Sequence, residues 1–314
     1  MGAFRDKICA RRAGILTYGL TPPRAAHETH KLVEIAERQR ALIRSLPVDA
    51  VVLYDLQDES SRDASPRPFA FLPTLDPFRY AHDYLGDPER ELIVYRAVAD
   101  HDPAEFAAWL AAADKSAQPA AVSFVGSPAR AAHAAARLSL KQAYALHAAH
   151  CKRLLLGGIC IAERHLKKGD EHVRMLEKQA LGCAFFVSQA VYDAAASEAL
   201  LRDLAAAASA RGVLPAPLLL TITPCGSEKA LEFMKWLGIS FAPAVEQRLR
   251  KSGDMLRESV AICEELIRKF ARQSSGSIPL GINVESVSIR RADIDAAAAL
   301  VEFARRELNA QHGL

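Results

Sequence analysis

The amino-acid sequence predicts a single-domain α/β protein, a (β/α)8 TIM barrel that spans all 314 residues. Eight short apolar segments lie along the chain, and each is followed by a segment with helical periodicity. These segments are apolar throughout, as is typical of parallel strands that are buried on both faces. Eight strand–helix pairs in a chain of this length fit a closed barrel. A doubly wound open sheet is the alternative, although no glycine-rich dinucleotide motif follows the first strand.

The first half of the chain supplies four strands, predicted at 13–21, 48–54, 91–98 and 120–125. The double proline Pro22-Pro23 ends the first strand, because proline has no amide hydrogen to donate to a strand ladder. The second strand leads into a long polar loop at 55–63. Asp102 and Pro103 begin the helix after the third strand, as N-cap and first helical residue. Helices are also predicted at 25–45 and 140–150.

The second half of the chain completes the pattern, with strands predicted at 154–162, 184–187, 217–223 and 282–289. Ser227 is the expected N-cap of one helix and Gly238 its expected C′ residue, since glycine readily adopts the left-handed conformation found there. The predicted helices are a segment through 173–180, then 194–210, 227–237, 254–272 and 292–308. Residues 1–12 are expected to be an N-terminal extension and 309–314 a C-terminal tail.

Composition and charge are those of an ordinary globular protein. Hydrophobic residues make up 50% of the chain and charged residues 25%, with a net charge of +3. Acidic and basic residues are mixed along the chain, so we expect no binding to nucleic acid or to a membrane surface. The six cysteines are scattered without a CxxC pair, which favours reduced thiols in a cytoplasmic protein. No segment has the pattern of a signal peptide or a membrane span.

The stretch 157–193 contains the polar groups that point most directly to a binding site. Glu163 and His165 follow the fifth predicted strand, and Gln189 ends the sixth. In (β/α)8 barrels, ligands bind at the carboxyl ends of the strands, where loops tolerate polar side chains. We therefore expect these three side chains to surround a common mouth.

Five short motifs occur in order along nearly the whole chain. They are YGLTPP at 18–23, Arg-Asp at 62–63, CIAERH at 160–165, GCAFFVSQ at 182–189 and Ile-Thr-Pro at 222–224. In this order and spacing the chain resembles the methylenetetrahydrofolate reductase family. The resemblance implies a (β/α)8 barrel that binds FAD and transfers a hydride from NAD(P)H to the one-carbon unit of a tetrahydrofolate.

The sequence departs from that family at several positions. Gly19 stands where the family carries a glutamate that acts as the acid, and glycine cannot transfer a proton. Tyr95 stands where the family has a flavin-side histidine, and Ser127 stands in place of an aspartate after the fourth strand. These last two losses resemble the branch of the family that works without flavin. The expected cofactor is therefore NAD(P)H, and FAD is the alternative.

The resemblance also suggests binding residues. A carboxamide both donates and accepts hydrogen bonds, which suits Gln189 to the amide edge of a pterin, although it could also cap a loop. The residues assigned to the folate are Gln189, Tyr192, Ser127 and Met234. Those assigned to the cofactor are Glu163, His165, Lys178 and Gly126. Glu163 and His165 could instead form an internal ion pair, and Lys178 could point to solvent.

With glycine at position 19, another group must supply the proton if the chemistry is retained. Asp55 is the first candidate, because it lies where the second strand meets the barrel mouth and burial could raise its pKa. The alternative is an exposed acidic loop, which also contains Asp58 and Glu59. Tyr18 is the second candidate donor, on the strand beside Gly19.

No metal site is predicted. His147, His150 and Cys151 have a spacing that could place them on one helix face, but zinc needs a further ligand and none is suitably spaced. The predicted function is reduction of a tetrahydrofolate derivative. The alternatives are a folate- or flavin-binding barrel without reductase activity, and a reductase that acts on a non-folate substrate.

Overall fold

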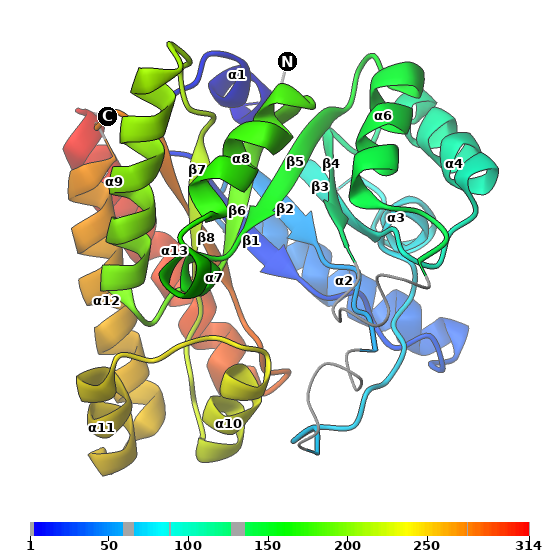
Figure 1. Cartoon of the computed structure of the whole chain (residues 1–314). Coiled ribbons are helices and arrows are strands. Elements are labelled where there is room, and N and C mark those ends of the chain that lie inside the picture. Colours follow the sequence, from blue (N-terminus) through cyan, green and yellow to red (C-terminus); the bar gives the residue numbers. More distant parts are fainter. Residues whose placement is uncertain (1–2, 59–65, 88, 127–135, 275, 314) are drawn as a thin grey trace.

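The computed structural model of the chain describes residues 3–58, 66–87, 89–126, 136–274 and 276–313. Eight parallel strands form a closed barrel in chain order, and β8 pairs with β1 to close it (Figure 1). This confirms the predicted (β/α)8 barrel and excludes the open sheet. The strands are β1 (Leu16–Leu20), β2 (Ala50–Leu53), β3 (Glu91–Ala97), β4 (Ala121–Val125), β5 (Leu155–Cys160), β6 (Cys183–Ala190), β7 (Leu218–Ile222) and β8 (Leu280–Glu285).

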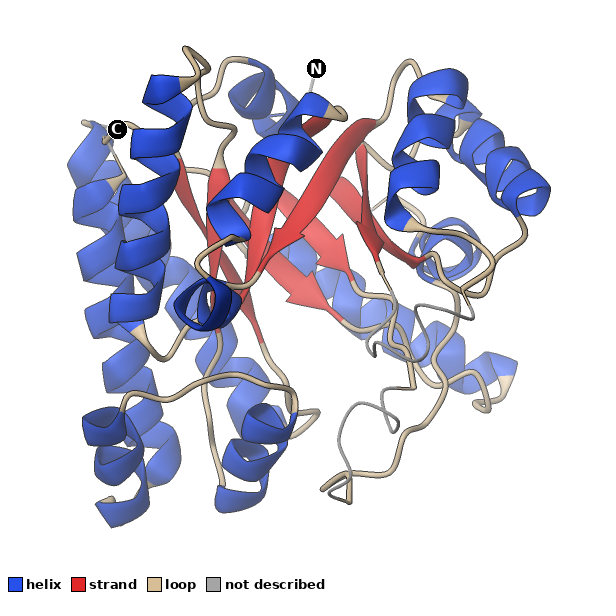
Figure 2. Ribbon diagram, in the orientation of Figure 1, coloured by secondary structure: helices blue, strands red, loops and turns tan. Residues whose placement is uncertain are grey.

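Helices surround the strands, as the secondary-structure colouring of Figure 2 shows. The helices are α1 (Ala3–Cys9), α2 (Thr29–Ser45), α3 (Pro77–Tyr80), the π-helical turn η1 (Ala81–Leu85), α4 (Pro103–Lys115), α6 (Leu140–His150), α7 (Ala162–Lys168), α8 (Glu171–Ala180), α9 (Ala194–Ala210), α10 (Glu228–Trp236), α11 (Pro243–Lys251), α12 (Met255–Gln273) and α13 (Arg291–His312). The predicted caps are confirmed: Asp102 accepts the Ala104 amide at 2.9 Å, and Ser227 accepts the Ala230 amide at 3.2 Å. Gly238 has the expected positive φ of 84°. The sequence did not predict α3, η1, α7 and α11.

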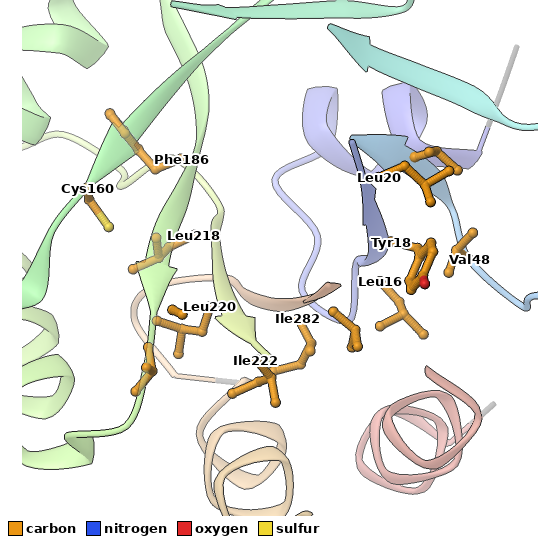
Figure 3. Close-up of a cluster of buried hydrophobic side chains, with 14 of the residues drawn as sticks. Leu16, Tyr18, Leu20, Val48, Cys160, Phe186, Leu218, Leu220, Ile222 and Ile282 are labelled. Carbon is orange, nitrogen blue, oxygen red and sulfur yellow. The ribbon is translucent and has the colours of Figure 1, made fainter. Parts of the chain in front are cut away.

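Alternate residues of each strand contribute to two hydrophobic layers. The outer layer lies between barrel and helices and includes Leu16, Tyr18 and Leu20 of β1, part of which Figure 3 shows. The inner layer fills the barrel and includes Ile15 and Val52. Each fully buried large apolar side chain contributes about 1.5–3 kcal/mol to the stability of this core. Tyr18 is therefore an outer-layer residue, and Gly19, the next residue, faces the interior.

Helix α1 closes the amino-terminal end of the barrel, where the sequence predicted only an extension. Phe4 and Ile8 are fully buried, and the Phe4 ring packs edge-on against Phe185 with centroids 5.3 Å apart. The Glu91 carboxylate at the start of β3 accepts the amides of Phe4 and Arg5 at 2.9 and 3.1 Å. Helix α1 thus covers the barrel interior at this end.

Strand β8 is displaced from its predicted position. The prediction was 282–289, whereas the strand spans Leu280–Glu285. It starts earlier because Gly281 pairs closely with the neighbouring strands: a side chain there would begin 2.5 Å from the Ile15 carbonyl oxygen. Only glycine fits that approach. The shift moves Glu285 from the middle of a predicted strand to its carboxyl end, at the barrel mouth.

All six cysteines are free thiols, as predicted. Within the described ranges, no helix has both the length and the apolar character needed to cross a membrane.

Candidate functional site

A polar layer crosses the barrel interior below its carboxyl-terminal mouth. Asn283 of β8 is fully buried at its centre. Its amide oxygen accepts the Thr17 hydroxyl at 2.8 Å, and its amide nitrogen donates to Tyr54 at 2.9 Å and to Thr221 at 3.2 Å. Every strong hydrogen-bonding group of Asn283 is thus satisfied within the protein. This layer lies just below the carboxyl ends of the strands.

Gly19 and Glu285 are direct partners across the β1–β8 pairing. A side chain at Gly19 would begin 2.6 Å from the Tyr54 ring and 2.9 Å from the Glu285 Cβ. Tyr54 and Glu285 therefore occupy the volume that a β1 side chain would take. The acid expected on β1 is absent, and a carboxyl group from β8 stands beside the position.

Glu285 is the most strongly perturbed carboxyl group at the mouth. Burial raises its pKa to about 7, and a hydrogen bond with Tyr54 acts in the opposite direction. Burial also raises the Tyr54 pKa well above its usual value, so this hydroxyl stays protonated and can donate. A carboxyl group with a pKa near neutrality is suited to general acid or base work. Glu285 as a whole residue is only partly buried, and it is the last residue of β8, at the barrel mouth.

Gln189 lies near the end of β6, in the irregular stretch of the β6–β7 pairing between Val187 and Ala190. Its amide nitrogen donates to the Leu237 carbonyl at 2.8 Å. Its amide oxygen is buried and has no hydrogen-bond partner among the described residues. An unpaired buried acceptor costs about 1–3 kcal/mol, which a ligand N–H at this position would recover. The placement of Gln189 agrees with a binding role.

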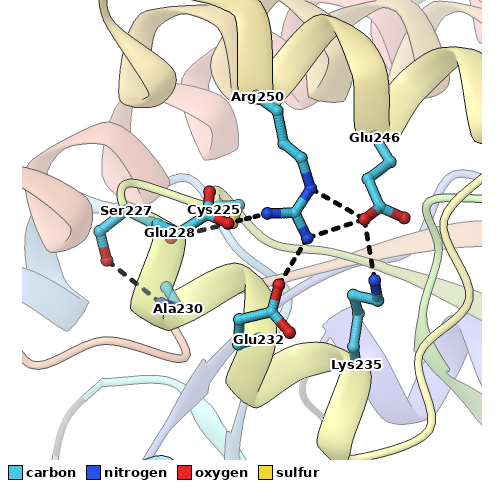
Figure 4. A network of polar contacts seen from close by, with 8 residues as sticks. All are labelled: Cys225, Ser227, Glu228, Ala230, Glu232, Lys235, Glu246 and Arg250. Atoms are coloured by element: carbon cyan, nitrogen blue, oxygen red, sulfur yellow. Dashed lines mark hydrogen bonds and ion pairs between the residues drawn. The ribbon is translucent and has the colours of Figure 1, made fainter.

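Helix α10 lies beyond the carboxyl ends of the strands (Figure 1) and is joined to α11 by an ion-pair network (Figure 4). Arg250 of α11 pairs with Glu228 and Glu232 of α10 and with Glu246 of its own helix. Lys235 of α10 donates to the same Glu246 at 2.8 Å. Networks of this kind order side chains more effectively than isolated surface pairs. The network fixes the end of α10, and with it the Leu237 carbonyl that orients Gln189.

Two residues assigned to the folate belong to the hydrophobic core. The Tyr192 hydroxyl donates to the Thr223 carbonyl at 2.6 Å, and its ring packs on Phe241 with centroids 4.3 Å apart. Met234 is fully buried in the outer layer. Neither side chain presents a free group to the mouth. Ser127, the remaining residue of this group, lies outside the described residues.

The residues assigned to the cofactor do not surround a common space. His165 Nε2 lies 3.0 Å from Asp203 of α9, in the helical layer. Lys178 donates to the Ile159 carbonyl at 2.5 Å, and burial lowers its pKa. Glu163 accepts the Ser240 amide at 3.4 Å, and burial raises its pKa.

The structure thus corrects both alternatives that the sequence left open for these residues. His165 pairs with Asp203 and not with Glu163, and Lys178 is buried and not pointed to solvent. A side chain at Gly126 would begin 3.0 Å from Leu140, so the backbone there is already covered. These four residues do not fit a dinucleotide or flavin cradle. The contact of His165 with Asp203 contradicts the expectation that Glu163, His165 and Gln189 surround a common mouth, and the binding role of Gln189 stays a prediction.

Asp55 and Tyr18, the two candidate proton donors, are held by contacts that do not suit that role. The Asp55 carboxylate accepts the Ala97 amide at 2.7 Å, which joins the ends of β2 and β3. Burial raises the Asp55 pKa, while the Ala97 amide and Arg96 lower it. Tyr18 lies in the outer layer, where burial raises its pKa to about 12. Tyr18 cannot deliver a proton to the mouth, and Glu285 is the better placed acid.

His147, one of the residues considered for a metal, has a structural contact instead. His147 Nε2 lies 3.1 Å from the Leu154 carbonyl, which ties α6 to the start of β5. Among the residues that the structure describes, no group of three or more His, Cys, Asp or Glu side chains is arranged to hold a metal ion.

Glu285, Tyr54 and Asn283 are the site residues that sequence reasoning missed. A signal was present: Asn283 and Glu285 are polar residues at alternate positions of one apolar strand. Alternate residues of a strand face the same side, so both had to point either into the barrel or into the helical layer. Two polar groups on one side of a buried strand indicate a polar interior.

The closed barrel and the polar side chains at its mouth define a (β/α)8-barrel protein, a fold in which ligands bind at the carboxyl ends of the strands. The chain belongs to the same family as an uncharacterised protein from Clostridium thermocellum that binds two copies of 5-methyl-5,6,7,8-tetrahydrofolic acid. The two chains are 36% identical over 96% of this chain and 99% of the other, with a TM-score of 0.83.

Other comparisons are less informative. A GH113 β-1,4-mannanase is 13% identical over 94% of this chain and 99% of its own, with a TM-score of 0.55, which shows the fold alone. No family profile and no curated protein matches the chain. The resemblance to methylenetetrahydrofolate reductases therefore stays a prediction.

Proposed function

We propose that this protein binds a reduced folate of the 5-methyltetrahydrofolate type, with the pterin ring held at the barrel mouth between Gln189 and Glu285. The buried, unpaired amide oxygen of Gln189 carries this proposal. A pterin presents N–H donors along its amide edge, and one of them would satisfy that oxygen. The 36% identical relative binds two molecules of this class.

Glu285 complements the same ligand. In its neutral form the carboxyl donates one hydrogen bond, and in its charged form it accepts hydrogen bonds from N–H groups. A pKa of about 7 makes both forms accessible at neutral pH. The polar layer below, centred on Asn283, keeps the pocket floor compatible with a polar ring.

Reduction of the one-carbon unit is a second candidate function, and one observation favours it. Converting a 5,10-methylene bridge to a 5-methyl group requires a proton at the nitrogen that is released, besides a hydride. Glu285 stands beside Gly19, the position at which the resemblance expected that acid. The hydride would come from NAD(P)H directly or, if the protein binds the alternative cofactor FAD, from the reduced flavin. The residues assigned to these cofactors form no cradle, so folate binding is the function that the geometry supports best.

Two measurements on one purified sample test these functions. Calorimetric titration with 5-methyltetrahydrofolate should give saturable binding, and a sample that binds no reduced folate would contradict the proposal. Absorbance spectra and NADH oxidation with 5,10-methylenetetrahydrofolate then separate the two candidates. Binding without turnover supports a folate-binding barrel, whereas turnover establishes the reductase and a flavin band identifies its FAD form.

A further inference from the structure

A rim of aromatic and cationic side chains lies at one side of the mouth. It comprises residues of the loop after β2 and residues of α10, two segments that both lie beyond the carboxyl ends of the strands in Figure 1. Phe69 of the loop packs edge-on against Phe233 of α10, with ring centroids 5.2 Å apart. Phe69 remains 39% exposed. This contact joins parts of the chain that are far apart in sequence, and it makes an open aromatic surface.

Arg67 lies within this rim and is surrounded by rings. Its guanidinium carbon is 5.2 Å from the centroid of Phe71, 5.3 Å from that of Phe233 and 5.4 Å from that of Trp236. Its Nε and Nη1 are buried and have no hydrogen-bond partner in the described part of the chain. A guanidinium whose N–H groups are unpaired can donate two parallel hydrogen bonds to a carboxylate, because both groups are planar and their spacing matches.

A second cation lies close by. Lys229 Nζ is 4.5 Å from the Phe69 ring. The nearest acidic residues on the same helix, Glu228 and Glu232, are both paired with Arg250. Arg250 partly offsets their charge. The rim thus presents two cations, Lys229 over Phe69 and Arg67 over Phe233, and these two rings contact each other.

The rim is directly connected to the proposed pterin position. Gln189 donates to the carbonyl of Leu237, and the neighbouring residue Trp236 packs against Arg67. A folate consists of a pterin, a flat aminobenzoyl ring and a glutamate with two carboxylates. With the pterin at Gln189, the aminobenzoyl ring would lie against aromatic side chains and the carboxylates near the two cations.

We infer that Arg67 and Lys229, with the aromatic rings around them, form a subsite for the carboxylates of the folate's glutamate tail. The inference rests on the proposed folate binding and adds which part of the ligand this rim recognises. It also explains why the loop after β2 and α10 both contribute to one wall of the mouth.

The test compares two ligands that share a reduced pterin. One is 5-methyltetrahydrofolate, and the other is 5,6-dimethyltetrahydropterin, which lacks the aminobenzoyl-glutamate. Dissociation constants are measured for the wild type, Arg67→Gln, Lys229→Gln and the control Arg272→Gln, an exposed arginine in the last turn of α12, which precedes β8 in the chain. Thermal unfolding of each variant verifies that it is folded.

Arg67→Gln should weaken folate binding about tenfold and leave pterin binding unchanged, because it removes a charge-assisted hydrogen bond to the carboxylates and none to the pterin. Lys229→Gln should act in the same direction, and Arg272→Gln should change neither ligand. Unchanged folate affinity in both rim variants would overturn the subsite, as would equal weakening of both ligands. If neither compound binds the wild type, the proposed function itself fails.

Discussion

Glu285 lies directly across from Gly19, and its Cβ is 2.9 Å from the point where a Gly19 side chain would begin. The glycine that removes an acid from β1 thus makes room for an acid from β8. Tyr54 fills the rest of the space and hydrogen-bonds with the Glu285 carboxyl. The mouth therefore keeps a protonatable carboxyl group next to the position at which the reductase resemblance expected one.

The raised pKa of Glu285 predicts a pH-dependent stability. Its pKa is about 7 in the folded protein against 4.5 for an unperturbed glutamate. The folded state therefore holds a proton that the unfolded state releases, and stability falls as pH rises between these two values. The loss reaches up to roughly 3 kcal/mol above the folded-state pKa.

Glu285→Gln should remove this dependence, because the amide is neutral at every pH in the range. Melting temperatures between about pH 5 and about pH 8 should fall for the wild type and stay closer to level for the variant. The exposed Glu302→Gln on α13 is the control and should follow the wild type. Parallel curves for Glu285→Gln and the wild type would show that Glu285 does not titrate in this range.

Gly19 is predicted to be required for packing. A Cβ at this position would lie 2.6 Å from the Tyr54 ring, closer than any normal contact. Gly19→Ala should therefore lower the free energy of unfolding by about 1–3 kcal/mol, as is typical of overpacking in a filled core. Gly253→Ala is a matched control, since nothing lies within 4 Å of its added Cβ. Chemical denaturation of both variants measures the difference, and equal stabilities would mean that the space beside Gly19 is open.

The fold was predictable because eight apolar segments and their helices are visible in the sequence, and burial on both faces leaves few other arrangements for them. The positions of the site residues were harder to predict from the sequence. His165 follows β5 closely, but α7 begins at Ala162, so the turn of helix carries His165 toward Asp203. The position of Glu285 at the end of a strand was not predicted, because the apolar pattern continues to Ile289 although β8 ends at Glu285. Which face a side chain takes depends on where each element starts, and periodicity gives that start only to within a few residues.

Gln189 is predicted to bind the folate through its unpaired oxygen. Gln189→Ala should weaken the affinity for 5-methyltetrahydrofolate by more than about tenfold, since a buried hydrogen bond to a ligand is worth about 1–3 kcal/mol. Calorimetric titration measures the change. Gln311→Ala, at an exposed position near the end of α13, is the control and should bind as the wild type does. Equal affinity in the two variants would show that Gln189 does not bind the folate.

The ion-pair network of Arg250 predicts an effect on binding from a residue that does not touch the ligand. Arg250 joins α11 to Glu228 and Glu232 of α10. Helix α10 carries two rings of the rim, Phe233 and Trp236, and is followed by Leu237, whose carbonyl accepts the hydrogen bond from Gln189. Removing this tie should let the end of α10 move. Arg250→Gln should therefore weaken folate binding severalfold while lowering stability by only about 1 kcal/mol, as expected for partly exposed ion pairs.

Arg248 offers a matched control on the same helix. It pairs with Glu258 and Glu265 of α12, so it ties α11 to its other neighbour. Arg248→Gln should cost a similar amount of stability and leave the folate affinity unchanged, because α10 keeps all of its contacts with Arg250. Titration calorimetry and thermal unfolding of the two variants separate the effects. If both variants bind folate equally well, α10 is held by its hydrophobic packing alone, and the network contributes to stability without shaping the mouth.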